Sequence, residues 1–492
     1  METIVATRSG QVQGVERAGV VAFKGIPYAA PPFGPRRMRP PEPAQSWDGV
    51  RDASSYGPTA PHGPYPAPYD ALLPEPIIPG EDCLNLNVWT PDPGAAGLPV
   101  LVWIHGGAFA NGSGAVPTYD GSAFARDGVV TVTINYRVGS DGFLYTGDGE
   151  ANVGMLDQVA ALEWVRENIA SFGGDPGRVT IAGESAGAYS VATLLAMPLA
   201  AGLFHRAISQ SGAGHFVLTP ETATKVAGYL AERLGVDATR EAIAAVPVEA
   251  LLSAQTQLST EAWQMPDPAK WGEIALNRMI FEPVVDGDVL AGRPVDLVTA
   301  GASAQIPVLA GSNAEEMRLF MVPNGLVDFV NDDLLAGAVA MYGLPVEPAL
   351  AAYRAEHPGS SAGELLADVA TDWTFRIPTI RLAERAGGPT YLYEFAWRTK
   401  QFDGRLGACH ALEIPFVFDT LGAEGGEALE TDSPPQSLAD DMHAAWVRFV
   451  TDGDPGWPAY TVADRTVMRF DETSELVRDP LPATRALWAG LR

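Results

Sequence analysis

The stretch RVTIAGESAGAYSVATLLAMP, residues 178–198, decides the fold. Residues 179–182 form a short apolar run typical of a buried strand, and an apolar helical stretch, 186–197, follows it directly. Between them Ser185 is flanked by Gly183 and Gly187. A serine on a sharp strand–turn–helix is the arrangement that exposes a nucleophilic hydroxyl above a sheet. The alternative is a tight turn in which Ser185 only caps the helix that follows.

Strand-like and helix-like segments alternate on both sides of this stretch. The segment 156–172 carries apolar residues at helical spacing. Strand-like apolar runs occupy 98–107, 129–136, 206–212, 306–313 and 389–397. Such alternation predicts an α/β fold with a large, mostly parallel central sheet that is flanked by helices.

Two regions interrupt the alternation and read as helices and loops, namely 213–305 and 324–385. We expect one α/β domain, 1–492, in which these two regions are helical insertions that form a lid over the active site. The segment 58–80 is so rich in proline that it predicts an irregular loop.

Composition excludes several classes of partner. The chain has 492 residues, 47% of them hydrophobic, and a formal charge of −28 from 60 acidic and 32 basic residues. Such a surface repels phosphate backbones and anionic headgroups, so we expect neither a nucleic-acid nor a membrane partner. No apolar run approaches 18 residues and the N-terminus lacks the pattern of a signal peptide. These features, with two cysteines too few for a disulfide framework, predict a cytoplasmic protein, and we expect a monomer.

A second turn of small residues lies in WIHGGAF, residues 103–109, at the end of the strand-like run 98–107. Backbone N–H groups of consecutive small residues can converge on one point because no side chains obstruct them. We expect an oxyanion hole formed by the amides of Gly107, Ala108 and Ala186. The alternative is an ordinary glycine turn at the end of a strand.

Seven blocks in this order resemble the type B carboxylesterases, the α/β-hydrolase family that includes bacterial p-nitrobenzyl esterases and the cholinesterases. The resemblance covers almost the whole chain. The blocks are FKGIPYAAPPFGPRRMRPPEP (23–43), EDCLNLNVWTPD (81–92), VWIHGGAF (102–109), NVGMLDQVAALEWVRENIASFGGDP (152–176), VTIAGESAGAYSV (179–191), SQSG (209–212) and GACHALEIPFVF (407–418).

The resemblance implies a catalytic triad with Ser185 as the nucleophile. His410 lies in the block that carries the family's histidine, and it follows Ser185 in the chain order that this fold uses. The acid follows the strand-like run 306–313, where Glu315 and Glu316 are adjacent. The family's Asp-Glu-Gly pattern implies Glu316 as the acid. Met317 replaces the usual glycine, which puts the geometry of this turn in question.

The implied reaction is ester hydrolysis through an acyl-enzyme, with no metal or organic cofactor and a small-molecule ester, short- to medium-chain or aryl, as the substrate. A histidine base predicts activity that rises with pH around an apparent pKa of roughly 6–7. Candidate pocket residues are Phe109, Phe281, Met317, Phe320 and Trp373.

Two alternatives remain at this point. The same triad would serve an amidase or a lactonase, because the acylation chemistry is shared. Some type B relatives are adhesion proteins that keep the fold and lose the triad. Here every position of the triad holds a chemically competent residue, which favours an enzyme.

Overall fold

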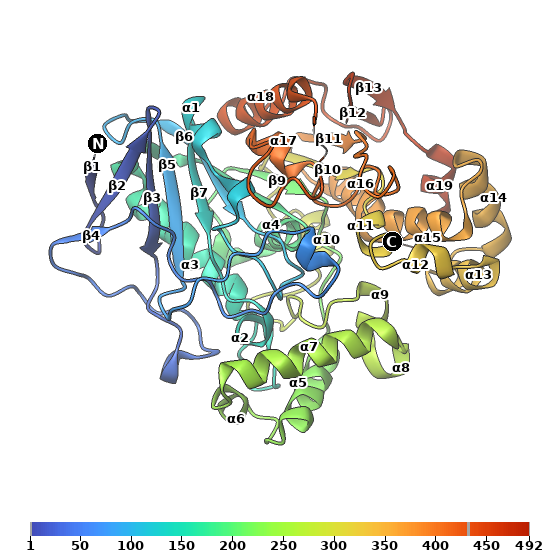
Figure 1. Ribbon diagram of the computed structural model, residues 1–492, viewed down its shortest axis with the longest axis horizontal. Helices are drawn as coiled ribbons and strands as arrows, with labels where there is room; N and C mark the ends of the chain where they lie inside the picture. Colours follow the sequence, from blue (N-terminus) through green and yellow to red (C-terminus); the bar gives the residue numbers. More distant parts are fainter. Residues whose placement is uncertain (1, 431–432, 492) are drawn as a thin grey trace.

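A computed structural model describes residues 2–430 and 433–491, and its centre is one sheet of 13 strands (Figure 1). The strand order is β1-β2-β3-β5-β7-β6-β8-β9-β10-β11-β12-β13, and β4 pairs with β2. The strands are β1 (Glu2–Ala6), β2 (Gln11–Arg17), β3 (Val20–Pro27), β4 (Val50–Asp52), β5 (Asn85–Thr90), β6 (Leu98–Ile104), β7 (Val130–Ile134), β8 (Gly174–Glu184), β9 (Arg206–Gln210), β10 (Val308–Asn313), β11 (Thr390–Phe395), β12 (Thr466–Phe470) and β13 (Glu475–Arg478).

The central strands, from β7 through β12, pair in parallel. Antiparallel pairs complete the sheet from β1 up to β7 and at β13, and the short strand β4 pairs with β2 in parallel. The predicted α/β fold with its mostly parallel sheet is confirmed. The pattern of the N-terminal hundred residues did not predict the strands β1 to β5, because these strands are short and lie among segments rich in proline and glycine.

Helices connect the strands and extend beyond the sheet. They are α1 (Ser122–Arg126), α2 (Gly139–Phe143), α3 (Val153–Asn168), α4 (Ala186–Ala196), α5 (Pro220–Leu234), α6 (Arg240–Ala244), α7 (Val248–Gln264), α8 (Pro268–Trp271), α9 (Ile274–Asn277), α10 (Pro294–Thr299), α11 (Arg318–Met321), α12 (Leu326–Phe329), α13 (Asp332–Met341), α14 (Val346–Glu356), α15 (Ala362–Thr371), α16 (Ile377–Arg385), α17 (Ile414–Phe418), α18 (Gln436–Asp452) and α19 (Pro482–Leu487).

Short turns of 3-10 helix lie between these elements, at η1 (Gly34–Arg36), η2 (Tyr69–Ala71), η3 (Pro117–Tyr119), η4 (Ile169–Phe172) and η5 (Pro198–Ala200). One turn of π-helix, η6 (Asp372–Arg376), joins α15 to α16.

Two apolar cores cover the two faces of the sheet. In β6, Val100 and Val102 belong to a core shared with α3 and α4, whereas Leu101 and Trp103 belong to a core shared with α17 and α18. Alternate residues of a strand point to opposite faces, so a strand covered on both sides must be apolar throughout. This explains the continuous apolar run of β6.

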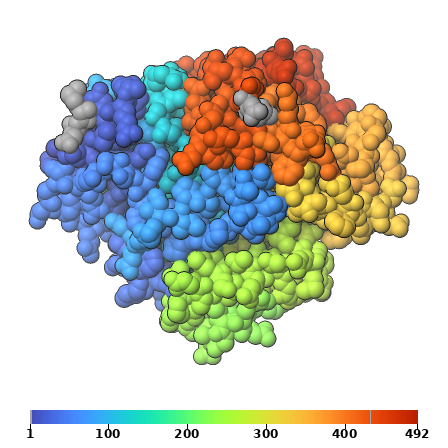
Figure 2. Space-filling view, viewed as in Figure 1, coloured from blue at the N-terminus to red at the C-terminus, as the bar shows by residue number. Residues whose placement is uncertain are grey.

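The two helical regions lie at the periphery of the sheet. Helices α5 to α9 form the green group at the bottom of Figure 1, and α12 to α15 lie at its right. In Figure 2 blue N-terminal segments cross the front between the green group and the orange C-terminal segments.

No single helix among the described residues is both long and apolar enough to cross a membrane. Helices α13 and α14 meet that test of length and composition when counted together, although a bend of 113° separates them.

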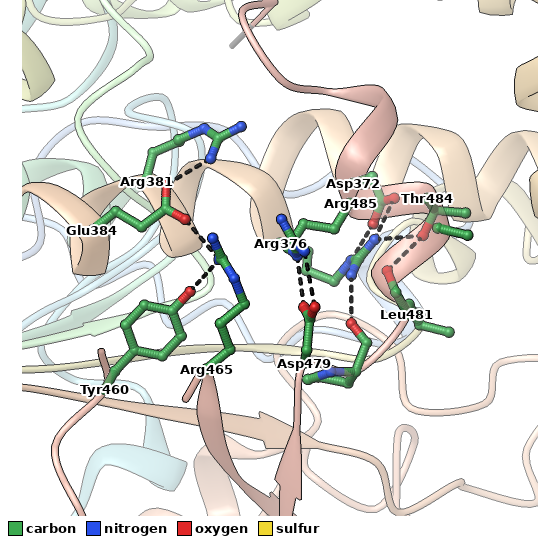
Figure 3. Close-up of polar contacts among 12 residues, drawn as sticks. Asp372, Arg376, Arg381, Glu384, Tyr460, Arg465, Asp479, Leu481, Thr484 and Arg485 are labelled. Carbon is green, nitrogen blue, oxygen red and sulfur yellow. Dashed lines mark hydrogen bonds and ion pairs between the residues drawn. The ribbon is translucent and has the colours of Figure 1, made fainter. Parts of the chain in front are cut away.

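A polar network ties the π-helical turn η6 to the C-terminal segment (Figure 3). Arg376 donates to Asp372 Oδ2 at 2.7 Å and to Thr484 Oγ1 at 2.9 Å. Nearby, Arg485 donates to both carboxylate oxygens of Asp479 at 2.6 and 2.8 Å. Buried charges are tolerated when they are paired and hydrogen-bonded in this way. The network therefore fixes η6, which contributes a side chain to the site described next.

Candidate active site

Ser185 lies at the sharp turn between β8 and α4. Its backbone has φ 56° and ψ −121°, a conformation that non-glycine residues rarely adopt. Its N–H donates to Gln210 O at 3.0 Å, and its carbonyl accepts from Tyr189 N at 2.9 Å. The side chain is half-buried and borders a cavity. The structure thus has the strand–turn–helix geometry predicted from residues 178–198, with the hydroxyl at the N-terminus of α4.

The two glycines that flank Ser185 are required by close packing. A Cβ atom at Gly187 would lie 2.0 Å from Ile104 O, and one at Gly183 would lie 2.5 Å from the carbonyl carbon of Gly187. Both distances are far below van der Waals contact. Glycine at these positions lets the first turn of α4 lie directly against the end of β6, which brings Ser185 beside the loop that follows β6.

His410 and Glu316 form a buried pair. His410 Nδ1 lies 2.6 Å from Glu316 Oε2, and the other carboxylate oxygen accepts from Asn313 N at 2.8 Å. The side chain of Glu316 is fully buried. The imidazole also packs between two phenyl rings, with centroid distances of 5.3 Å to Phe320 and 4.7 Å to Phe375 of η6. These contacts fix both the orientation and the tautomer of the ring, because Nδ1 must carry the proton that Glu316 accepts.

Glu315 points away from His410. It forms ion pairs with Arg318, at 2.8 Å, and with Arg398, and it accepts a hydrogen bond from Ala408 N at 2.9 Å. The two adjacent glutamates therefore have different partners. Glu315 holds the backbone of the segment that carries the histidine, whereas Glu316 contacts the imidazole.

Met317 does not distort the turn. Its φ of −70° and ψ of −8° lie in the ordinary right-handed helical region, which any residue can adopt. Its N–H donates to Thr371 Oγ1 at 3.1 Å. The backbone geometry of this turn therefore does not require glycine at position 317.

A third carboxyl group faces the imidazole from the other side. Glu184 Oε1 lies 3.0 Å from His410 Nε2, and both side chains are almost completely buried. No hydrogen bond joins Ser185 Oγ to His410 in the described structure. Since Nδ1 already donates to Glu316, two close lone pairs at Nε2 and Oε1 would repel each other unless one proton lies on the imidazole or on the carboxyl group. The pair therefore holds one proton in this arrangement.

Burial and charge perturb both groups. Burial raises the pKa of Glu184 to about 8. Burial alone would lower the pKa of His410, but the carboxylates of Glu184 and Glu316 outweigh it and raise that pKa. Burial also raises the pKa of Glu413, which accepts from Asn313 Nδ2 at 2.7 Å and Gln210 Nε2 at 3.1 Å. Of these groups Glu184 and His410 line one cavity, and perturbed titratable groups in a cavity are typical of a catalytic site.

The loop after β6 bends sharply beside Ser185. Gly107, Ala108 and Phe109 have φ values of 108°, 54° and 55°. Gly107 O accepts from both Ala110 N and Asn111 N at 2.9 Å, which closes the turn. Among the described residues, no protein oxygen accepts a hydrogen bond from the amides of Gly107, Ala108 or Ala186. These amides remain available to a substrate oxygen, as an oxyanion hole requires.

A cavity connects these groups. It comprises about 890 Å³ of space, part of it open to solvent, and it is bordered by Gly106 to Ala108, by Ser185 and by His410. Most of its wall is apolar. Its ionisable lining groups among the described residues are Tyr65, Glu75, Tyr119, Glu184 and His410, and that part of the chain contributes no lysine or arginine to the wall.

Of the five predicted pocket residues, Phe320 lines this cavity. The other four do not. Phe109 is fully buried and packs on Phe143 at 4.8 Å, and Phe281 is 2% exposed within the core. Trp373 stacks near Tyr342 and Trp488, and Met317 packs against the core. Periodicity in the sequence indicates that an aromatic residue is buried, but it does not tell whether the side chain faces the cavity or the apolar core.

Neither helical region borders the cavity. No described residue of 213–305 or 324–385 lines it. The proline-rich segment 58–80 does so instead, through Tyr65 and residues 72–75. Neither these wall residues nor Phe375 against the imidazole could be predicted, because an irregular loop and a π-helical turn both lack the periodicity that allows a side chain to be placed.

The sheet, the strained serine after a strand and the histidine–carboxylate pair define an α/β-hydrolase, and comparisons with known proteins narrow the class. Residues 1–486 match the carboxylesterase family. The para-nitrobenzyl esterase of Bacillus subtilis is 38% identical over 97% of this chain and 96% of its own, and the phenmedipham hydrolase of Pseudarthrobacter oxydans is 37% identical over 97% of each. The crystal structure of a Geobacillus stearothermophilus carboxylesterase at pH 6.2 superposes with a TM-score of 0.86 at 38% identity, covering 99% of this chain and 100% of that one.

The chain therefore belongs to the carboxylesterase family. It is a carboxylic-ester hydrolase of the α/β-hydrolase fold.

Proposed function

We propose that the chain hydrolyses neutral carboxylic esters through an acyl-enzyme on Ser185, with His410 as general base and Glu316 as the acid that orients it. The observation that carries this proposal is the buried 2.6 Å contact between His410 Nδ1 and Glu316 Oε2, in a cavity that Ser185 also lines. The cavity and the three groups together supply a nucleophile, a base and an orienting carboxylate.

The reaction follows from these positions. Once the proton shared by His410 and Glu184 has left, Nε2 can accept the proton of Ser185 as its Oγ attacks the ester carbonyl. The amides of Gly107, Ala108 and Ala186 stabilise the tetrahedral oxyanion, each to the extent of about 3–4 kcal/mol. His410 then protonates the leaving alcohol, and water repeats the sequence on the acyl-enzyme. Glu316 stabilises the imidazolium in both halves.

The cavity wall favours uncharged substrates. Apolar side chains such as Leu72, Leu319 and Ile414 suit an alkyl or aryl group, whereas the carboxyl group of Glu184 disfavours an anion and no described lysine or arginine offsets it. We infer that neutral short- to medium-chain and aryl esters are substrates and that esters with a free carboxylate on the acyl chain are not.

A set of matched p-nitrophenyl esters tests both parts. We expect turnover across the acetate, butyrate and octanoate series, and kcat/KM for mono-p-nitrophenyl glutarate should be about tenfold or more below that for p-nitrophenyl pentanoate. The matching p-nitroanilides separate an esterase from an amidase. Equal rates for the charged and uncharged esters would contradict the inference on charge, and a failure to react with a fluorophosphonate probe would contradict the proposed nucleophile.

The acidic surroundings of His410 predict a shift in pH dependence. Because neighbouring carboxylates raise the pKa of His410, the base becomes neutral only at higher pH, and kcat/KM should rise with pH beyond the range of an ordinary histidine. Glu184→Gln removes one of these charges, so the pKa falls and the rising limb of the pH–rate profile should move to lower pH by about 1–3 units.

The control is Glu81→Gln, which removes an exposed carboxylate and should leave the limb in place. If the rising limb of the pH–rate profile stayed in place in Glu184→Gln, or moved to higher pH, Glu184 would not be raising the pKa of His410.

We further propose a cytoplasmic monomer. Cys83 and Cys409 are both buried and free, which suits a reducing compartment. Sedimentation of the purified chain, together with fractionation of its host cells, tests both statements.

A further inference from the structure

The proline-rich loop, residues 58–80, is fastened to the turn that carries the predicted oxyanion donors. Asn111 Nδ2 donates to Gly63 O at 2.6 Å, and Gly112 N donates to Glu75 Oε1 at 2.9 Å. The two ends of the loop are joined by a hydrogen bond from Thr59 N to Ile78 O at 3.0 Å. Asn111 and Gly112 therefore have hydrogen-bond partners that precede them by 48 and 37 positions.

Glu75 and His62 form a buried pair at the centre of this contact. His62 Nε2 lies 2.6 Å from Glu75 Oε1, and the two side chains are 0% and 6% exposed. His62 Nδ1 lies 2.7 Å from the carbonyl oxygen of Ala60, so it must donate its proton there. Nε2 and Oε1 can approach this closely only if a second proton lies between them, on the imidazole or on the carboxyl group. The pair is therefore joined by an ion pair or by a strong hydrogen bond.

The turn that Glu75 contacts is under strain. Ala108 and Phe109 are non-glycine residues with positive φ, and such a backbone persists where surrounding contacts over-determine it. Gly112 folds back on the start of the turn so closely that a Cβ there would lie 2.3 Å from Gly106 O. The hydrogen bond from Gly112 N to Glu75 closes this turn, and both residues border the same cavity as Gly107 and Ala108.

We propose that Glu75, held by His62, is a positioning residue for the oxyanion hole. It fixes the turn through Gly112, and so sets where the amides of Gly107 and Ala108 point. This inference rests on the proposed function, since it assigns a role within the same site. Its direct consequence is that the loop 58–80 contributes to stabilisation of the transition state as well as forming a wall of the cavity.

The test compares an inhibitor that mimics the oxyanion with one that does not. An alkyl trifluoromethyl ketone forms a tetrahedral adduct with the serine whose oxygen occupies the oxyanion hole, whereas the corresponding secondary alcohol only fills the cavity. We expect Glu75→Ala to lower kcat/KM and the affinity for the ketone together, by about 10- to 100-fold. The inhibition constant of the alcohol should change by less than about threefold, since the wall remains apolar.

Two further variants separate positioning from a general loss of structure. Glu75→Gln keeps an oxygen that can accept from Gly112 N, so it should recover most of the ketone affinity. His62→Ala should shift the ketone affinity in the same direction as Glu75→Ala, and the double variant should be no worse than Glu75→Ala alone, because the two side chains act as one unit. Asp70→Asn removes an exposed carboxylate from the same loop and should match the wild type.

The proposal is overturned if Glu75→Ala binds the ketone as tightly as the wild type does, or if ketone and alcohol weaken equally. If Glu75→Ala fails to fold, the same comparison in Glu75→Gln and His62→Ala decides, and wild-type ketone affinity in His62→Ala would then overturn it. A wild-type enzyme that neither hydrolyses esters nor binds the ketone would instead refute the proposed function, which is a different outcome.

Discussion

Ser185→Ala should abolish ester hydrolysis, with kcat reduced by about 10⁵–10⁶-fold. No other described side chain on the cavity wall combines a hydroxyl with a position beside both His410 and the amides of the predicted oxyanion hole. The variant should fold normally, because the hydroxyl is half-buried and makes no hydrogen bond to His410. Turnover of p-nitrophenyl butyrate and labelling by a fluorophosphonate both measure the loss.

Ser211→Ala is a matched control for this change. Ser211 also has a positive φ, 55°, and it follows the neighbouring strand β9, but it is completely buried. The probe cannot reach it, and we expect activity within about tenfold of the wild type. If Ser185→Ala retained activity in that range while Ser211→Ala lost it, the nucleophile would have to be reassigned.

Glu316→Gln should lower kcat by about 10³–10⁴-fold, or roughly 4–5.5 kcal/mol in the activation free energy. The amide keeps the shape of the carboxylate but lacks the charge that stabilises the imidazolium. It can also donate to Nδ1, which would place the remaining proton on Nε2, where the base must accept. Steady-state kinetics at several pH values measure the effect.

The neighbouring residue provides the comparison. Glu315→Gln should reduce kcat by less than about tenfold, because Glu315 faces Arg318 and Arg398 and not the imidazole. It should lower the melting temperature instead, since two arginines lose their partner. If Glu315→Gln were the severe change in kcat, the acid would be Glu315 and the contact at 2.6 Å would not be the functional one.

Local patterns predicted the centre of the molecule well. The strand–turn–helix at residues 178–198 could be interpreted because an apolar strand and an apolar helix meet at a turn that requires glycine two positions before and two positions after the serine. Adjacent glutamates after β10 were harder to tell apart. Only the resemblance to a family favoured Glu316, because the direction of two neighbouring side chains in a turn depends on backbone angles that the sequence does not state.

Features that depend on distant packing could not be predicted in this way. Phe109 is indistinguishable by sequence from a pocket residue, yet the turn at 107–109 directs it into the core against Phe143. The expected pKa of His410 was that of an ordinary histidine, since nothing in the chain order indicates that Glu184 and Glu316 lie on its two sides. Glu75 lies in a loop without periodicity, and its importance appears only when Gly112 is placed beside it.

The order of the strands also has a consequence for how the enzyme is made. The predicted nucleophile follows β8, whereas the predicted acid follows β10 and the predicted base follows β11. At typical rates of translation, roughly 10–45 s pass between the synthesis of Ser185 and that of His410. A nascent chain can therefore fold its N-terminal strands and present a serine in a strained turn while no base exists to activate it. On the proposed mechanism, hydrolysis can therefore begin only after His410 has been synthesised and has docked beside Ser185.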